Sequence, residues 1–162
     1  MSVEISLEGT VDAWIQDAGN VESLAESALE AIGKSDHDLS IVLTDDEHIR
    51  FLNRDFRQKD SATDVLSFPQ MDDEPFVSPI PILGDLVISL ETAARQAEER
   101  GHPLAAEVQI LLVHGLMHLL GHDHLEDGDR ADMAEAENEL LAALPSPPEW
   151  PTSSGLVTLA ES

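Results

Sequence analysis

The sequence predicts one domain of the α+β class, built on a mixed four-stranded sheet packed with about five helices. Segments with strand and helix patterns are mixed along the chain, and two of the predicted strands are joined by a loop without a helix. This loop-linked pair favours a mixed sheet. At 162 residues the chain can bury a core of its own. We expect the domain to cover residues 1–144 and the proline-rich tail 145–162 to be flexible.

The four predicted strands are recognised by alternating or β-branched residues between turn signals. The opening VEISLEG alternates like a half-buried strand, and DLSIVLT is rich in β-branched residues. TDVLSFP is closed by a proline, and an acidic, proline-containing loop leads from it to LGDLVIS. These segments cover residues 3–9, 38–44, 63–69 and 83–89.

Five segments have helical spacing of apolar residues or helix-end signals. Asp45 or Asp46 can cap the second helix, and Gly101 ends the third. Pro103 fits the first turn of the fourth, whose interior AAEVQILLVHGLMHLL is apolar enough to be mostly buried. The predicted helices cover residues 21–33, 46–56, 91–100, 103–121 and 129–144.

Composition limits the chemistry and the location. The chain has no cysteine, so a bound metal must be held by histidine and carboxylate side chains. The start MSVEISLEGT lacks the basic and apolar regions of a secretory signal. The longest apolar run, Leu140 to Leu144, is too short to span a bilayer. We therefore expect a soluble cytoplasmic protein.

The charge distribution is uneven. Thirty-three acidic residues against eight Lys and Arg give a net charge of −25, which alone argues against a nucleic-acid substrate. Yet half of the positive side chains fall within ten residues, as Arg50, Arg54, Arg57 and Lys59. This basic cluster is either a solvated helix face or a local anion-binding surface.

The segment HGLMHLLGHDH at residues 114–124 has the pattern of a metal site. His114 and His118 are four residues apart, on one face of a helix, so they can share an ion. Gly121 allows the chain to turn back and bring His124 to that ion, while His122 is expected either to contact a metal-binding histidine or to be exposed. Three imidazoles leave one position of a tetrahedral zinc for water, which is typical of a catalytic site.

Metzincin proteases share this histidine spacing but place a glutamate after the first histidine as general base. Here that position is Gly115. A peptidase would therefore lack its proton acceptor, and a metallopeptidase ranks below other hydrolases.

Three blocks together resemble the YbeY family of ribosomal RNA maturation factors, over about residues 38–141. They are NRDFRQKDSATDVLSFP (53–69), LGDLVIS (83–89) and HGLMHLLGHDH (114–124). The resemblance implies a zincin-like domain with one zinc at the end of a buried helix, on His114, His118 and His124. It also implies single-strand-specific cleavage of RNA.

The resemblance further implies a role in 3′-end maturation of small-subunit (16S) ribosomal RNA and in ribosome quality control. The small subunit and its RNA are then the expected partners, ribosomal proteins or assembly GTPases are candidates, and neither DNA nor a membrane is expected. The family's functional arginine, in its N-x-x-[YF]-R pattern, corresponds to Arg57.

Combining the motif and the basic cluster gives each residue a predicted role. Arg57 and His114 are the predicted catalytic residues, because phosphodiester cleavage needs an activated nucleophile and a cation for phosphoryl charge. Asp85 and Asp123 are candidate hydrogen-bond acceptors for the N–H groups of the metal-binding histidines. The candidate RNA-binding residues are Arg50, Arg54 and Lys59.

One alternative from another class remains open at this point. The chain could be a non-catalytic ribosome-assembly protein in which zinc is structural and the RNA is only bound. A structural zinc would be required for folding, so metal removal separates the two readings.

Overall fold

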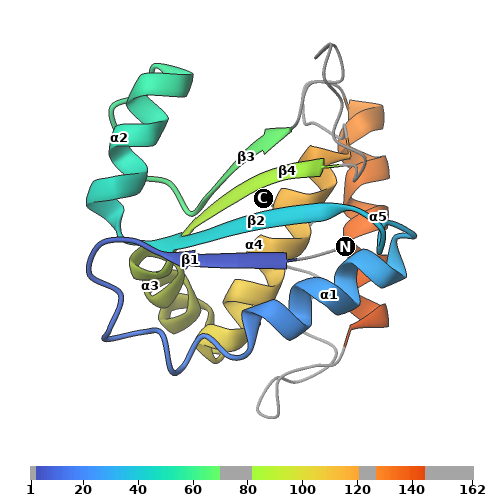
Figure 1. The fold of residues 1–162 in the computed structure, drawn as a ribbon, viewed down its shortest axis with the longest axis horizontal. Coiled ribbons are helices and arrows are strands. Elements are labelled where there is room, and N and C mark those ends of the chain that lie inside the picture. Colours follow the sequence, from blue (N-terminus) through green and yellow to red (C-terminus); the bar gives the residue numbers. More distant parts are fainter. Residues whose placement is uncertain (1–2, 70–81, 121–126, 145–162) are drawn as a thin grey trace.

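The computed structural model describes residues 3–69, 82–120 and 127–144, with side chains of the last segment described from residue 135 onward. Within these residues it contains the four predicted strands and five predicted helices, so the α+β class is confirmed (Figure 1). The strands are β1 (Val3–Leu7), β2 (Asp38–Thr44), β3 (Val65–Pro69) and β4 (Ile82–Ser89). The helices are α1 (Val21–Ala31), α2 (Asp46–Arg57), α3 (Leu90–Arg100), α4 (Leu104–Leu119) and α5 (Asp127–Ala143).

The sheet is mixed, as predicted, with the strand order β1-β2-β4-β3. β1 and β4 lie parallel to β2, while β3 pairs antiparallel with β4. The loop-linked strands β3 and β4 are therefore the antiparallel neighbours, and β3 forms one edge of the sheet. The predicted tail, residues 145–162, lies outside the described residues.

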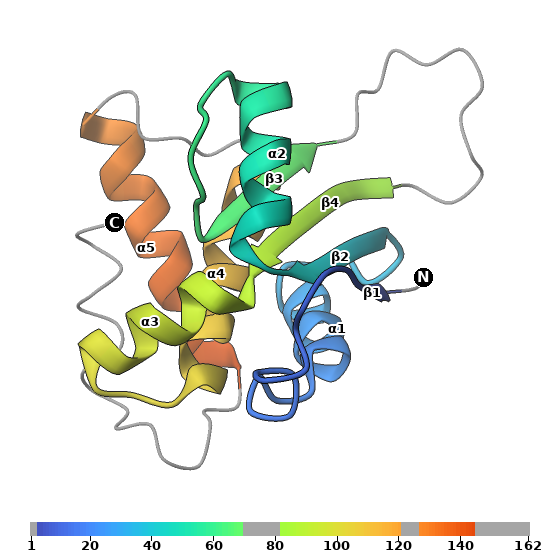
Figure 2. The same cartoon turned by 90° about the vertical axis from the view of Figure 1, so that its left-hand side faces the viewer.

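One face of the sheet carries the main core. Leu39, Ile41 and Leu43 of β2 are almost fully buried there, in one cluster with side chains of α1, α4 and α5. α1 and α4 pack on the strands, and α5 packs against α4 and α1 (Figure 1). The opposite face is covered beside β3 and β4 by α2, whose Ile49 packs against Leu66 and Val87 (Figure 2).

The helix α4 is buried on nearly all sides, as its composition predicts. Twelve of its sixteen residues are buried, and beyond its first two residues only His114 and His118 are not. Pro103 precedes the helix as its N-cap instead of occupying its first turn. No helix in the described part of the chain has the length and apolarity needed to cross a bilayer.

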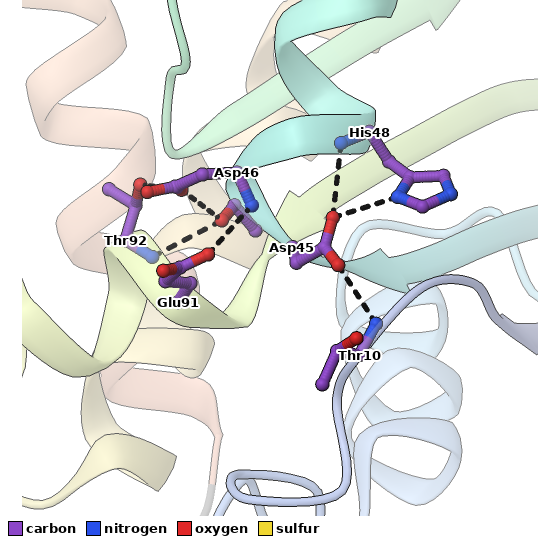
Figure 3. Close-up of polar contacts among 7 residues, drawn as sticks. Thr10, Asp45, Asp46, His48, Glu91 and Thr92 are labelled. Atoms are coloured by element: carbon purple, nitrogen blue, oxygen red, sulfur yellow. Dashed lines mark hydrogen bonds and ion pairs between the residues drawn. The ribbon is translucent and has the colours of Figure 1, made fainter.

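Asp45 and Asp46 anchor the start of α2, where a cap was predicted (Figure 3). Asp45 is the N-cap: its carboxylate accepts from the backbone N–H of His48 at 3.0 Å and of Thr10 at 2.8 Å. Its oxygen also lies 2.8 Å from His48 Nδ1. Asp45 therefore ties α2 to the segment that follows β1.

Asp46 joins α2 to α3. Its carboxylate accepts hydrogen bonds from the hydroxyls of Ser89, at 2.7 Å, and Thr92, at 2.5 Å, and lies 2.9 Å from Arg95 Nη1. The backbone N–H of Asp46 donates to Glu91 Oε1 at 3.1 Å (Figure 3). Burial raises the pKa of Asp46, but the hydrogen bonds from Thr92, Ser89 and Arg95 outweigh it and hold the pKa below 3.8.

We predict that Asp46→Ala lowers the free energy of unfolding at pH 7 by about 1.5–3 kcal/mol, because it removes hydrogen bonds to a charged, partly buried acceptor. The folded pKa is below the unfolded one, so this stabilisation is full above the unfolded value and is lost as pH falls through the folded pKa. Urea titrations at pH 7 and below pH 3.8 should therefore show a difference from the wild type that shrinks in acid. Asp55→Ala, an exposed change on the same helix, should stay within about 0.5 kcal/mol at pH 7. An Asp46→Ala deficit that is equal at both pH values contradicts this account.

Candidate metal centre and nucleic-acid surface

The two histidines predicted to share an ion lie together at the C-terminal end of α4. The Nε2 atoms of His114 and His118 are 3.2 Å apart, and their rings meet edge to face with centroids 4.7 Å apart. Two nitrogens that each lie 2.0–2.1 Å from a tetrahedral zinc are separated by about 3.3–3.4 Å. The pair therefore fits a shared zinc ion without a rearrangement of the helix.

The third predicted ligand, His124, comes from the segment that follows α4 in the chain. Among the side chains that the structure describes, in residues 3–69, 82–120 and 135–144, no third histidine or carboxylate completes a ligand set with this pair. His124 lies outside the described residues, and so do His122 and Asp123. The role of His124 as third ligand stays a prediction.

Glu137 of α5 belongs to this site and was missed in the sequence. Its Oε1 lies 2.7 Å from His114 Nδ1, and the residue is only 1% exposed. A signal was present: Glu137 precedes Leu140 and Leu141 by three and four residues, which puts all three on one helix face. Both leucines are buried, so that face carries the carboxylate into the core.

Gly115 sets how closely α4 approaches the sheet. A Cβ atom at this position would lie 2.7 Å from Leu86 Cδ2 and 3.3 Å from Val65 Cγ2. The Ser67 hydroxyl on β3 donates to the Gly115 carbonyl at 3.1 Å. Packing thus explains the glycine, and the position where metzincins hold a glutamate has no room for one here.

Asp85 is not brought to the histidines. Leu86 contacts α4, and adjacent residues of a strand point to opposite faces, so Asp85 of β4 points away from α4. Its cross-strand neighbours are Ser40 and Phe68. The structure places Asp85 within β4, and a described carboxylate beside His114 is instead that of Glu137.

Two arginines of the basic cluster are engaged with carboxylates. Arg50 donates to both oxygens of Asp60, at 2.8 and 3.2 Å, and these hydrogen bonds lower the pKa of Asp60. Arg54 lies 3.3 Å from Asp55 and stacks over the ring of Phe51 at 4.8 Å. Much of the positive charge of α2 is therefore compensated locally.

Arg57 differs from these residues. Of the five arginines whose side chains the structure describes, it is the one without an ion pair or hydrogen bond. It is the last residue of α2, and Lys59 follows it in an exposed segment. The preceding Phe56 is 66% exposed and touches Phe68 of β3 edge to face, with centroids 5.4 Å apart.

The edge strand β3 lies between the two parts of the site. Phe68 contacts the end of α2, and the adjacent Ser67 contacts the histidine-bearing turn of α4 from the other face of the sheet. Figures 1 and 2 show both helices flanking this strand. Among the described contacts none joins Arg57 to either histidine, and β3 lies between α2 and α4.

Comparisons with known proteins identify the family of the chain. A model of the family described as Endoribonuclease YbeY matches residues 4–145. The Endoribonuclease YbeY of Paramagnetospirillum magneticum is 42% identical over 153 residues, which cover 89% of this chain and 93% of that protein. The protein of the same name from Stutzerimonas stutzeri is 40% identical and is covered to 94%, as is this chain.

A solved structure shares the fold of this chain. The solution structure of TM1509 from Thermotoga maritima superposes with a TM-score of 0.58 and 25% sequence identity, over 87% of each chain. A family match over most of the chain, together with relatives of this identity, leaves one assignment. The chain belongs to the YbeY endoribonuclease family.

Proposed function

We propose that this chain is a zinc-dependent endoribonuclease that cleaves single-stranded RNA. The observation that carries the proposal is the 3.2 Å separation of the His114 and His118 Nε2 atoms, which suits a shared tetrahedral ion. Family membership supports the RNA substrate. The proposed stoichiometry is one zinc per chain, with His124 as the third ligand.

The biological role we propose is 3′-end maturation of small-subunit ribosomal RNA and ribosome quality control, in the cytoplasm. The partners would be ribosomal RNA and the small subunit, with ribosomal proteins or assembly GTPases as candidate protein partners. The support for this role is the resemblance in the three sequence blocks at residues 53–69, 83–89 and 114–124.

The residues of the chain divide the work of binding and cleavage. His114 and His118 would hold the ion, which supplies Lewis-acid activation of water and charge stabilisation at a phosphoryl group. Arg57 would donate two parallel hydrogen bonds to phosphate oxygens, which its planar guanidinium allows. Because no described carboxylate engages Arg57, it can do so without breaking an ion pair.

The proposed path of the RNA crosses the edge strand β3. A single-stranded RNA that passes over β3 could touch the end of α2 on one side and the histidines on the other. The exposed ring of Phe56, next to Arg57, offers a base a stacking surface. A base that is paired within a duplex cannot stack on a side chain in this way, so the surface favours single strands.

Two alternatives can be weighed against the structure. α4 is buried in a core shared with α1, α5 and the sheet, which gives the fold a source of stability other than zinc. This favours the enzyme over an assembly protein with a structural zinc. A metallopeptidase is disfavoured because Gly115 packs against Leu86 where a general base would be needed.

We predict about one zinc per chain in protein purified with zinc, and less than half an equivalent in His118→Ala, since one of the ligands is lost. Metal analysis by mass spectrometry measures this directly. Removing the metal should leave the helical circular dichroism and a cooperative thermal transition, with a lower melting temperature because zinc binds only the folded state. Loss of the cooperative transition on metal removal would instead support a structural zinc.

Arg57→Ala should lower the cleavage rate at saturating RNA by roughly 100-fold, the effect of losing one well-placed electrostatic donor. Zinc content and melting temperature should be unchanged. Arg57→Lys should recover part of the rate, because the charge remains but the bidentate geometry is lost. Arg50→Ala is the matched control: its guanidinium is already bound to Asp60, so RNA binding should weaken only slightly. If Arg57→Ala cleaves RNA at the wild-type rate while Arg50→Ala does not cleave it, the catalytic cation is not Arg57.

Phe56→Ala should weaken the binding of a short single-stranded RNA by about 1–3 kcal/mol, the range for losing one stacked base. Phe56→Trp should keep the affinity, because stacking needs only an aromatic face. Phe51→Ala on the same helix should have less effect, since Arg54 already covers that ring. Fluorescence anisotropy with zinc-free protein measures binding without cleavage. Equal affinities for Phe56→Ala and the wild type would rule out the stacking role.

A further inference from the structure

We propose that Glu137 positions His114 in the metal site. This inference rests on the zinc binding proposed above. The carboxylate lies 2.7 Å from His114 Nδ1 and comes from α5, twenty-three residues further along the chain. It is 1% exposed, against 17% for the His114 side chain that it touches. A carboxylate so far from water requires a donor, and the contact with His114 meets that need.

The contact determines which nitrogen of His114 faces the ion. A neutral imidazole carries one N–H, and its other nitrogen presents a lone pair. With the proton on Nδ1 the ring donates to Glu137, whereas with the proton on Nε2 two acceptors would face each other in a buried place. Glu137 therefore selects the Nδ1–H form, which leaves the Nε2 lone pair on the side of His118.

Glu137 also holds the direction of the His114 ring. The backbone of α5 is fixed against α4 by the buried Leu140 and Leu141, so the carboxylate is presented from a packed helix. An acceptor on a rigid element restricts rotation of the ring and keeps its Nε2 atom 3.2 Å from that of His118. The negative charge further offsets the positive charge of a bound ion.

A purely structural role makes a different prediction. If Glu137 only linked α4 and α5, its replacement would lower the stability of the metal-free protein and leave the zinc affinity of the folded protein unchanged. If it positions His114, zinc affinity must fall even where the fold is intact. Zinc affinity and metal-free stability, measured separately, therefore distinguish the two roles.

The test compares zinc affinity in five proteins by competition with a chromophoric chelator. Glu137→Ala should weaken zinc binding by about 10- to 100-fold, as expected for loss of an outer-shell carboxylate. Glu137→Gln keeps the shape and an acceptor oxygen but not the charge, so its affinity should lie between those of the wild type and Glu137→Ala. Glu139→Gln makes the same charge change at an exposed position of α5 and should match the wild type. Asp85→Asn, on the far face of the sheet, should match it too.

A second readout follows the geometry of the site. Cobalt(II) in place of zinc gives a visible absorption spectrum that reports coordination, and this spectrum should change in both Glu137 variants and in neither control. Thermal melts of the metal-free proteins identify the variants that fold. If Glu137→Ala does not fold, the zinc affinity of Glu137→Gln tests the positioning role. If the folded Glu137 variants bind zinc as tightly as the wild type, the role of Glu137 is overturned and the proposed metal site is not. Failure of the wild type to bind zinc would overturn the proposed metal site and, with it, this inference.

Discussion

The close approach of α4 to the sheet at Gly115 is the contact on which the rest of the structure depends. A side chain there would collide with Leu86, and the carbonyl of Gly115 is bound by Ser67. Helix α4 is buried on almost every side, and beyond its first two residues only His114 and His118 are not fully buried. The same contact places the histidine pair beside the edge strand β3. The packing of α4 thus places the backbone that carries the pair, and the contact with Glu137 orients the His114 ring.

Local sequence patterns predicted most of the fold and, in the site, the facing of His114 and His118. The strands, the helices, the cap at Asp45 and the burial of α4 follow from periodicity and end signals, which act over a few residues. The facing of His114 and His118 also follows, because a spacing of four is a property of one helix. The predicted position of Asp85 beside the histidines was wrong, because Asp85 and its neighbour Leu86 in β4 point to opposite faces of the sheet.

Glu137 could not be assigned in the same way, because its partner is twenty-three residues away on another helix. Its spacing from Leu140 and Leu141 places Glu137 on a buried helix face, but only the packing of α5 on α4 identifies His114 as the group it meets. The relation of Arg57 to the histidines is similar. Their positions depend on which face of the sheet each helix covers, and that choice is made by tertiary packing.

The net charge of −25 and an RNA substrate can be reconciled by the local arrangement of charges. Long-range repulsion slows the encounter and weakens with salt, whereas contacts made within the site depend on the groups that touch the RNA. Arg50 and Arg54 are neutralised by neighbouring carboxylates, and Arg57 keeps its charge available beside Phe56.

The most direct test of the account is cleavage of a single-stranded RNA by the same protein before chelation, after complete removal of its metal, and after addition of one equivalent of zinc. The account predicts that cleavage is lost on metal removal while the protein stays folded, and that it returns with zinc. Undiminished cleavage by folded protein with no detectable metal would contradict it.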